Sequence, residues 1–277
     1  MTRAADALIS AAARIGGDTP RLDAEVLLAH LIGCTRGDLL LHPDRPIDGK
    51  AYDQLVSRRA AGEPVAHITG HREFWSLDLL VTPDVLIPRP DSETLIEVAV
   101  KQCPPLPARI LDLGTGSGAL LLAALSEWPQ ATGLGIDASP AALAVAQANA
   151  QRTGLADRAA FRLSNWGEGL AEHFDLILCN PPYIADDEPL ASDVRDHEPA
   201  TALFAGSDGL ADYRRILPQL PGLLTPDGLA VLEIGHAQGP ALLALAAVHG
   251  FRASLHPDLA GRDRCVVLWV APFKAPA

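Results

Sequence analysis

The sequence of 277 residues contains little of what a metal centre, a secreted protein or a membrane span requires. Its four cysteines lie far apart and form no CxxC pair, so we expect no bound metal. No apolar run approaches the ~20 residues that cross a bilayer. The first residues carry Arg3 and Asp6 instead of the apolar core of a signal peptide. These absences favour a cytoplasmic protein with no membrane contact.

Positive charge is also scarce, since only 3 of the 22 basic residues are lysine and the formal net charge is −12. Residues 1–75 are nearly balanced, with 9 Lys and Arg against 10 Asp and Glu, whereas residues 76–277 hold 13 against 24. Proteins that bind duplex DNA or structured RNA usually present a basic face to the phosphates. Acidity also serves solubility, but this balance leads us to expect no direct nucleic-acid partner.

The first part of the chain is predicted to be a small helical domain. Apolar residues recur there at helical spacing and predict helices over Ala4–Ile15, Leu22–Leu31 and Ala51–Ala61. Residues 76–90 are interpreted as a hairpin or linker, because three prolines prevent a continuous helix. We expect residues 1–75 to bind the substrate, residues 91–277 to form the catalytic domain, and the chain to act as a monomer.

Strand and helix patterns alternate from residue 91 onward. The expected strands are Ala108–Leu113, Thr132–Asp137, Ala159–Leu163, Phe174–Cys179, Leu229–Ile234, Arg252–Leu255 and Cys265–Val270. The expected helices begin near Asp91 or Ser92, at Ala119, after the N-cap Ser139, near Leu210 and at Pro240. Apolar strands that alternate with helices predict an α/β fold, in which a parallel sheet is covered on both faces and ends in an antiparallel pair.

A glycine-rich turn follows the first of these strands and consists of Gly114, Thr115, Gly116, Ser117 and Gly118. Glycines let the backbone turn tightly and approach a ligand closely. Asp137 ends the second strand, where a carboxylate can accept both ribose hydroxyls of an adenosine. The same spacing fits the G-x-G-x-x-G/A pattern, so an NAD-dependent dehydrogenase is a rival. Asp112, placed to reach the amino group of a methionine moiety, favours S-adenosylmethionine.

The strand Phe174–Cys179 leads into a second motif, formed by Asn180, Pro181, Pro182 and Tyr183. The prolines fix the backbone, and the Pro181 carbonyl and the Asn180 side-chain oxygen can accept both hydrogens of a planar NH2 group. Such acceptors stabilise the nitrogen as its delocalised lone pair becomes available, and Tyr183 offers a ring for packing. The motif predicts methylation of a planar amide or amino nitrogen.

Nearly the whole chain resembles the protein-(glutamine-N5) methyltransferases that modify peptide-chain release factors. The resemblance rests on both motifs and on four further segments: Arg21–Leu28, Gly62–Gly70, Arg72–Trp75 and Leu86–Glu93. It implies a class I S-adenosylmethionine-dependent methyltransferase fold, with a Rossmann-like seven-stranded sheet and a small N-terminal helical-bundle domain. It also implies that the substrate is the glutamine of the release factor's Gly-Gly-Gln loop, and that the helical domain helps to bind that factor.

The resemblance assigns roles to particular residues. It implies cofactor contacts at Gly114–Gly118, Asp137, Trp166 and Asn180, and substrate contacts at Asn180–Tyr183. Trp166 would flank the adenine, although packing in the core would also explain a tryptophan there. Many relatives have an acidic residue directly before it, where this chain has Asn165. We expect at most a modest loss of cofactor affinity from this difference.

Other functions stay open at this point. The segment Asn180–Tyr183 is shared with enzymes that methylate adenine or guanine amino groups, although the acidity of the chain and the lack of a target-reading domain oppose a nucleic-acid substrate. An interaction protein that binds a translation factor and has lost catalysis is opposed by the intact motifs. A dehydrogenase is opposed by the lack of a recognisable hydride-transfer residue.

Overall fold

The computed structural model describes residues 2–103 and 107–270, which divide into two compact units. The first unit comprises residues 2–71 together with Leu190–His197, and the second comprises residues 72–189 and 198–270 apart from the gap. In the described part of the chain, no helix combines the length and the apolar composition needed to cross a membrane.

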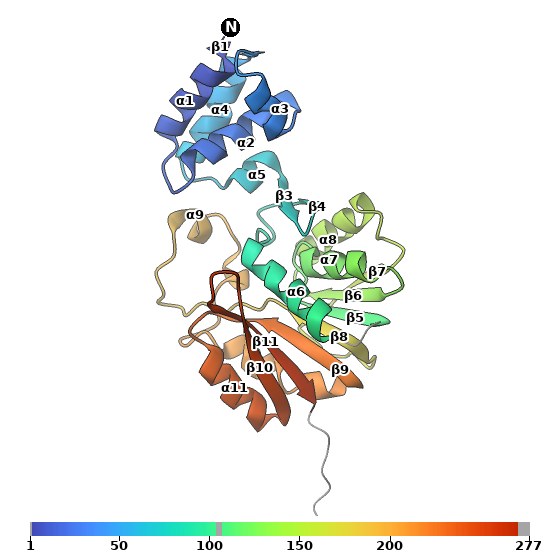
Figure 1. The fold of residues 1–277 in the computed structure, drawn as a ribbon. Helices are drawn as coiled ribbons and strands as arrows, with labels where there is room; N and C mark the ends of the chain where they lie inside the picture. Colours follow the sequence, from blue (N-terminus) through green and yellow to red (C-terminus); the bar gives the residue numbers. More distant parts are fainter. Residues whose placement is uncertain (1, 104–106, 271–277) are drawn as a thin grey trace, which may run out of the picture. The chain divides into compact units, whose positions relative to one another are not determined.

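The first unit is mainly helical (Figure 1). Its elements are β1 (Thr2–Arg3), α1 (Ala4–Arg14), α2 (Pro20–Ile32), α3 (Arg36–Leu41), β2 (Pro46–Ile47), α4 (Gly49–Ala60), α5 (Val65–Thr69) and α9 (Ser192–Arg195). Helices α1, α2 and α4 lie where apolar spacing predicts them. The short α3 and α5 were not predicted, because too few residues repeat in them to show a period.

The core of the first unit holds the helices together through apolar side chains from α1, α2 and α4. Tyr52 of α4 is buried in this core and donates its hydroxyl hydrogen to the Ala24 carbonyl of α2 at 2.8 Å. Asp48 caps α4 by accepting from the backbone N–H groups of Lys50 and Ala51. Apolar packing and local capping therefore both stabilise this unit.

The second unit is built on a mostly parallel sheet, and its strands and helices alternate as predicted. Within the described residues the sheet has seven strands, in the order β10 (Phe251–Pro257), β11 (Asp263–Val270), β9 (Leu224–Glu233), β8 (Phe174–Cys179), β5 (Arg109–Leu113), β6 (Thr132–Asp137) and β7 (Ala159–Leu163). Strand β11 pairs antiparallel with both β9 and β10. The expected antiparallel pair is therefore present, with β10 at the edge and β11 inside the sheet.

Helices cover both faces of this sheet. The remaining elements of the unit are β3 (His71–Phe74), β4 (Leu77–Leu80), η1 (Pro90–Ser92), α6 (Glu93–Gln102), α7 (Ala119–Glu127), α8 (Pro140–Arg152), η2 (Ala200–Ala202), α10 (Ala211–Ile216), η3 (Leu220–Gly222) and α11 (Gly239–Val248). Residues of α6 and α7 form one apolar layer with the sheet, and residues of α10, η3 and α11 form the other. Along β5, Ile110 enters the first layer and Leu111 the second.

The helix predicted near Leu210–Leu220 is shorter than expected. Helix α10 ends at Ile216, two residues before Pro218. Proline has no N–H to donate and restricts the residue before it, so the helix cannot continue through this position.

The strand order positions the functional site. Strand β5 has β6 on one side and β8 on the other: the chain continues from β5 to β6 and β7, and then crosses back to β8 on the far side of β5, so the strand order reverses at β5. Ligands bind at such a switch point, beyond the carboxyl ends of the strands. The glycine-rich turn follows β5, Asp137 ends β6, Asn180 follows β8 and Glu233 ends β9. Residues that are distant in sequence therefore meet at one edge of the sheet.

One buried side chain ties the glycine-rich turn to the hairpin β3–β4. Asn149 of α8 is fully buried, and its amide accepts from Leu80 N at 2.7 Å and donates to Leu80 O and Ser117 O, each at 2.9 Å. We predict that Asn149→Ala lowers the free energy of unfolding by about 3 kcal/mol, because three backbone groups, two on the partly buried Leu80 and one on the buried Ser117, lose their partner. Chemical denaturation measures this loss. Gln147→Ala, on the exposed side of the same helix, serves as the control, and an equal loss in both variants would contradict the account.

Candidate active site

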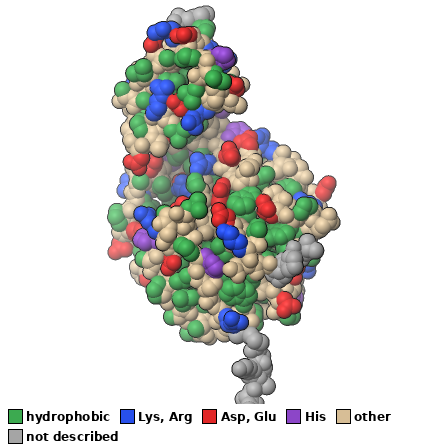
Figure 2. Space-filling view, viewed as in Figure 1, with side chains coloured by type: hydrophobic (Ala, Val, Ile, Leu, Met, Phe, Trp, Pro, Cys, Tyr) green, Lys and Arg blue, Asp and Glu red, His purple; other side chains and the backbone are tan. Residues whose placement is uncertain are grey.

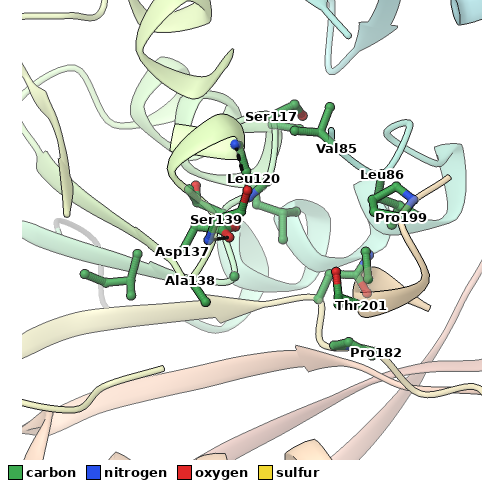
Figure 3. A pocket seen from close by; sticks show the side chains of 18 of the residues that line it. Val85, Leu86, Ser117, Leu120, Asp137, Ala138, Ser139, Pro182, Pro199 and Thr201 are labelled. Carbon is green, nitrogen blue, oxygen red and sulfur yellow. Dashed lines mark hydrogen bonds between the residues drawn. The ribbon is translucent and has the colours of Figure 1, made fainter. Parts of the chain in front are cut away.

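A cavity of about 550 Å³ lies in the second unit at the carboxyl edge of the sheet. Figure 3 shows that several segments form the wall of this cavity: Ser117 belongs to the glycine-rich turn, Asp137–Ser139 lie at the end of β6, and Val85 and Leu86 lie in the segment before α6. Pro182, Pro199 and Thr201 come from the chain after β8. The cavity therefore extends from the glycine-rich turn to the segment Asn180–Tyr183.

The glycine-rich turn is held rigidly on one side of the cavity. Gly114, Gly116 and Gly118 all have positive φ, which favours glycine. The Thr115 hydroxyl donates to Asp112 Oδ2 at 2.6 Å. Asp112 is buried beneath the turn, and its burial raises the pKa of its carboxyl to about 7. Asp112 is not among the residues that line the cavity, so what the structure shows of it is support for the turn.

Asp137 connects the turn to the end of β6. Its Oδ2 accepts from Gly116 N and its Oδ1 accepts from Ser139 N, both at 2.9 Å. Each carboxylate oxygen has a second lone pair. Because Asp137 lines the cavity, these lone pairs are available to the hydroxyls of a ligand.

Trp166 covers the turn in a strained conformation. Its φ is +53°, which is unusual for a bulky residue, and such outliers are concentrated at functional sites. Its indole ring lies so close to Gly114 that a Cβ added there would meet Trp166 Cζ3 at 3.1 Å. The indole N–H is buried and has no partner within the described residues. The Trp166 side chain therefore forms an aromatic part of the cavity wall, with its indole N–H buried behind that wall.

The close contact between Gly114 and Trp166 predicts that a methyl group added at Gly114 destabilises the site. Gly114→Ala combines a Cβ clash against Trp166 with a φ of +72°, so we expect a loss of about 1–3 kcal/mol in unfolding free energy and a weaker bound cofactor. Gly154→Ala is the matched control, because its φ is +73° and nothing lies within 4 Å of the added methyl. Calorimetric titration with S-adenosylhomocysteine should show weakening in the Gly114 variant alone, and equal affinities in both would contradict this role.

Asn165, which precedes Trp166, is already engaged by protein groups. Its Oδ1 accepts from Arg215 at 2.7 Å, and its Nδ2 donates to Glu168 Oε1 at 3.1 Å. Arg215 also donates to Asp212 at 3.0 Å, and all three of Asn165, Arg215 and Asp212 line the cavity. These three polar side chains of the cavity wall are therefore connected in one hydrogen-bond network.

Asn180 also lines the cavity and is anchored through its amide nitrogen. Its Nδ2 donates to Ser92 Oγ at 3.1 Å, and Ser92 in turn donates to Glu233 Oε2 at 2.5 Å. Within the described residues, no donor is bonded to Asn180 Oδ1. The side chain thus keeps an unused acceptor at the cavity wall.

Glu233 is the buried end of this network. It is 1% exposed, and Tyr183 also donates to it, at 3.3 Å to Oε1. Burial raises the pKa of Glu233 to about 7, although the hydrogen bond from Ser92 and the charge of Arg264 oppose that rise. The same burial raises the pKa of the Tyr183 hydroxyl, which therefore stays protonated and able to donate.

The structure brings most of the predicted site residues to one cavity. Those that line it are Gly114, Thr115, Gly116, Ser117, Asp137, Trp166, Asn180 and Pro182. Gly118, Pro181 and Tyr183 do not line it. A Cβ on Gly118 would meet Ala146 and Leu122 at 3.3 Å, so this glycine allows α7 and α8 to pack closely. Tyr183 packs on the second apolar layer.

Sequence reasoning missed several residues of the site. Ser92 was considered only as a helix cap, but its hydroxyl makes no capping bond and is used by Glu233. No sequence pattern assigns a role to Glu198. It is buried, accepts from Ile87 N at 3.0 Å and pairs with Arg89, so it holds the segment before α6 against the cavity. Glu233 also belongs to the site, and its sequence signal is a carboxylate that directly follows the apolar residues 229–232 at the end of β9.

Fold and site together define a class I methyltransferase: a seven-stranded sheet with one reversed strand and a nucleotide-sized cavity beside a glycine-rich turn. Comparisons with known families agree. Residues 107–238 match a family described as a methyltransferase domain, and residues 4–70 match the PrmC N-terminal domain.

Curated relatives identify the family. A release factor glutamine methyltransferase from Cereibacter sphaeroides is 46% identical, over 95% of this chain and 97% of the relative. Proteins of the same name from Rhodospirillum rubrum and Caulobacter vibrioides are 43% and 42% identical; they align over 91% and 95% of this chain and over 79% and 93% of their own lengths. The chain belongs to the release factor glutamine methyltransferase family.

Solved structures agree on the fold alone. A methyltransferase from Pyrococcus furiosus aligns over 71% of this chain and 90% of its own, with a TM-score of 0.56 and 14% identity. The catalytic domain of hMettl16, in complex with the MAT2A 3'UTR hairpin 1, aligns over 77% of this chain and 79% of its own, with a TM-score of 0.56 and 20% identity.

Proposed function

We propose that this enzyme transfers the methyl group of S-adenosylmethionine to the N5 side-chain amide nitrogen of a release-factor glutamine, the one in the Gly-Gly-Gln loop. The names of the curated relatives support the substrate. The observation that carries the chemistry is the anchored amide of Asn180, whose nitrogen is held by Ser92 and whose oxygen is unused.

The cavity has the chemistry of an adenosylmethionine site. The positive-φ glycines of the turn let the backbone approach a ligand, Asp137 offers carboxylate lone pairs to ribose hydroxyls, and Trp166 offers an aromatic surface. We propose that Gly114–Ser117, Asp137, Trp166 and Asn180 contact the cofactor, with Gly118 shaping the turn from behind. The bound cofactor supplies an electrophilic methyl group on a sulfonium.

The protein makes the glutamine nitrogen reactive by binding its two hydrogens. We propose that Asn180 Oδ1 and the Pro181 carbonyl oxygen accept one each, which stabilises positive charge on the nitrogen as its lone pair leaves conjugation. The same two bonds aim that lone pair at the methyl group. Pro182 lines the cavity, and the Tyr183 ring, held by its hydroxyl at Glu233, supports the planar amide. The proton then leaves from a cationic nitrogen, so no strong base is required.

The remaining parts of the chain are assigned by the same proposal. Residues 1–75 bind the release factor, residues 76–90 connect the domains, residues 91–277 carry out the transfer, and the enzyme acts as a cytoplasmic monomer. Nucleic acid is not expected to be a direct substrate. On the face seen in Figure 2, Lys and Arg side chains lie scattered among Asp and Glu and do not gather in one stripe.

A labelling experiment tests the proposal. The protein is incubated with radiolabelled S-adenosylmethionine and purified release factor, and the modified peptide is located by mass spectrometry. We expect label on the Gly-Gly-Gln glutamine, and none on a release factor whose glutamine is replaced by alanine. Label that appears only on RNA or DNA would favour an amino-methyltransferase of nucleic acid. No label on any substrate despite cofactor binding would favour a protein that has lost catalysis.

A further inference from the structure

We propose that Ser92 and Glu233 are positioning residues that decide which side of the Asn180 amide faces the substrate. This inference deepens the proposed function and rests on it, since it concerns the acceptor that Asn180 offers to the glutamine NH2 group. Neither residue needs to touch the substrate, because each acts through the next hydrogen bond in a chain of three side chains.

The donors and acceptors of these three side chains determine the direction of each hydrogen bond. An ionised carboxylate can only accept, so the hydroxyls of Ser92 and Tyr183 both donate to Glu233. Ser92 has a single hydrogen, and it is used in this bond. It can therefore only accept from Asn180, which turns the Asn180 nitrogen toward Ser92 and leaves its oxygen for the substrate.

Protonation of Glu233 removes this constraint. A neutral carboxyl can donate to Ser92 Oγ, and the Ser92 hydrogen then becomes available to Asn180 Oδ1. The Asn180 amide rotates to accept it and presents its own NH2 group to the substrate. Two NH2 groups that face each other have donors and no acceptor, so the glutamine loses one of the two bonds that activate it.

The position of these residues supports a switch of this kind. Ser92 and Glu233 are 3% and 1% exposed, so water cannot easily replace either partner. Ser92 sits at the start of α6 but makes no capping bond, which leaves its hydroxyl to Glu233. Burial raises the pKa of Glu233 to about 7, so both protonation states are populated near neutral pH.

Other titratable and charged groups surround Glu233 and influence its ionisation. They are Asp91 before α6, Arg264 and Cys265 on β11, Cys179 at the end of β8, Tyr183 after it, and Tyr213 on α10. Arg264 favours the ionised form and pairs with Asp91 at 3.0 Å, whereas Asp91 opposes ionisation. Cys179, Cys265 and Tyr213 stay neutral, because burial raises the pKa of each.

Turnover measured against pH tests the inference. In the wild type, kcat at saturating release factor and cofactor should rise about tenfold from pH 6 to pH 8, because the ionised fraction of a group with a pKa near 7 rises by that factor. Ser92→Ala should lower kcat at pH 8 about 5- to 10-fold, the effect of one lost hydrogen bond, and should flatten the profile to within about twofold. Ser92→Thr keeps the hydroxyl and should restore both kcat and the slope.

Two further variants separate positioning from folding. Glu233→Gln cannot titrate, so its profile should also be flat, which tests the inference even if Ser92→Ala unfolds. Ser126→Ala removes a hydroxyl that bonds only within α7 and should match the wild type. The inference is overturned if Ser92→Ala keeps the wild-type kcat. It is also overturned if kcat of Ser92→Ala or Glu233→Gln still falls about tenfold from pH 8 to pH 6, since another group such as Asp112 would then be responsible for the pH dependence.

One comparison distinguishes this inference from the proposed function. If Asn180→Ala keeps the wild-type turnover, the proposed role of Asn180 is wrong, whatever Ser92 does. If Asn180→Ala is inactive while Ser92→Ala and Glu233→Gln both behave like the wild type, the proposed function stands and the inference about Ser92 and Glu233 is wrong.

Discussion

Replacing Asn180 with alanine is expected to lower kcat by about 10²–10³, the effect of removing one preorganised polar group that acts on the transition state. The side chain is well placed for this, because Ser92 holds its nitrogen and no described residue is bonded to its oxygen. Steady-state methylation of the release factor, with both substrates saturating, measures the loss. Turnover within twofold of the wild type would end the mechanistic account.

The control for this prediction is the affinity of the variant for S-adenosylhomocysteine. Most cofactor contacts are assigned to the glycine-rich turn, Asp137 and Trp166, so the Kd for S-adenosylhomocysteine should change by less than about threefold in Asn180→Ala, below 1 kcal/mol. Thermal unfolding should also stay close to that of the wild type, because Asn180 is only partly buried. A loss of cofactor binding equal to the loss of kcat would assign Asn180 to the cofactor site alone.

Asp137→Ala should weaken cofactor binding by roughly 1.5–3 kcal/mol, the range for hydrogen bonds to a charged group, which is about 10- to 150-fold in Kd. Two effects contribute. The ribose loses its acceptor, and the N–H groups of Gly116 and Ser139 lose the carboxylate that holds the turn in place. Isothermal titration with S-adenosylhomocysteine measures the change.

Two variants sharpen this second prediction. Asp137→Asn keeps an acceptor without the charge and should fall between the wild type and Asp137→Ala. Asp157→Ala removes an exposed carboxylate that does not line the cavity and should leave the Kd unchanged. An unchanged titration in Asp137→Ala would reject the ribose role of this residue.

Much of the second unit could be predicted from the sequence, because its signals are local. The predicted strand Ala108–Leu113 is mostly apolar and is followed by the glycine-rich turn, and β5 occupies Arg109–Leu113. Ser139 and Pro140 mark a helix start, and Ser139 caps α8 by accepting from Ala142 N. Asp137 and Asn180 were predicted at strand ends, and parallel strands place such ends at one edge.

The long-range contacts that hold the site residues in place could not be predicted from the sequence in the same way. Ser92 and Glu233 are 141 positions apart, and their hydrogen bond exists only because η1 and the end of β9 meet in the fold. Nor does any pattern indicate that Leu190–His197 joins the first unit, where Asp193 lies 3.9 Å from Arg59. Contacts between distant segments depend on how the whole chain packs, and one sequence contains no period that reports them.

The activation of the glutamine amide by two oxygen acceptors can be observed in a crystal structure of the enzyme with S-adenosylhomocysteine and a peptide that contains Gly-Gly-Gln. We expect the glutamine amide nitrogen to lie about 3 Å from both Asn180 Oδ1 and the Pro181 carbonyl oxygen, with the sulfur of S-adenosylhomocysteine on the side of the nitrogen that neither oxygen occupies. An amide nitrogen that faces Asn180 Nδ2, or that lies beyond hydrogen-bond distance of both oxygens, would contradict it.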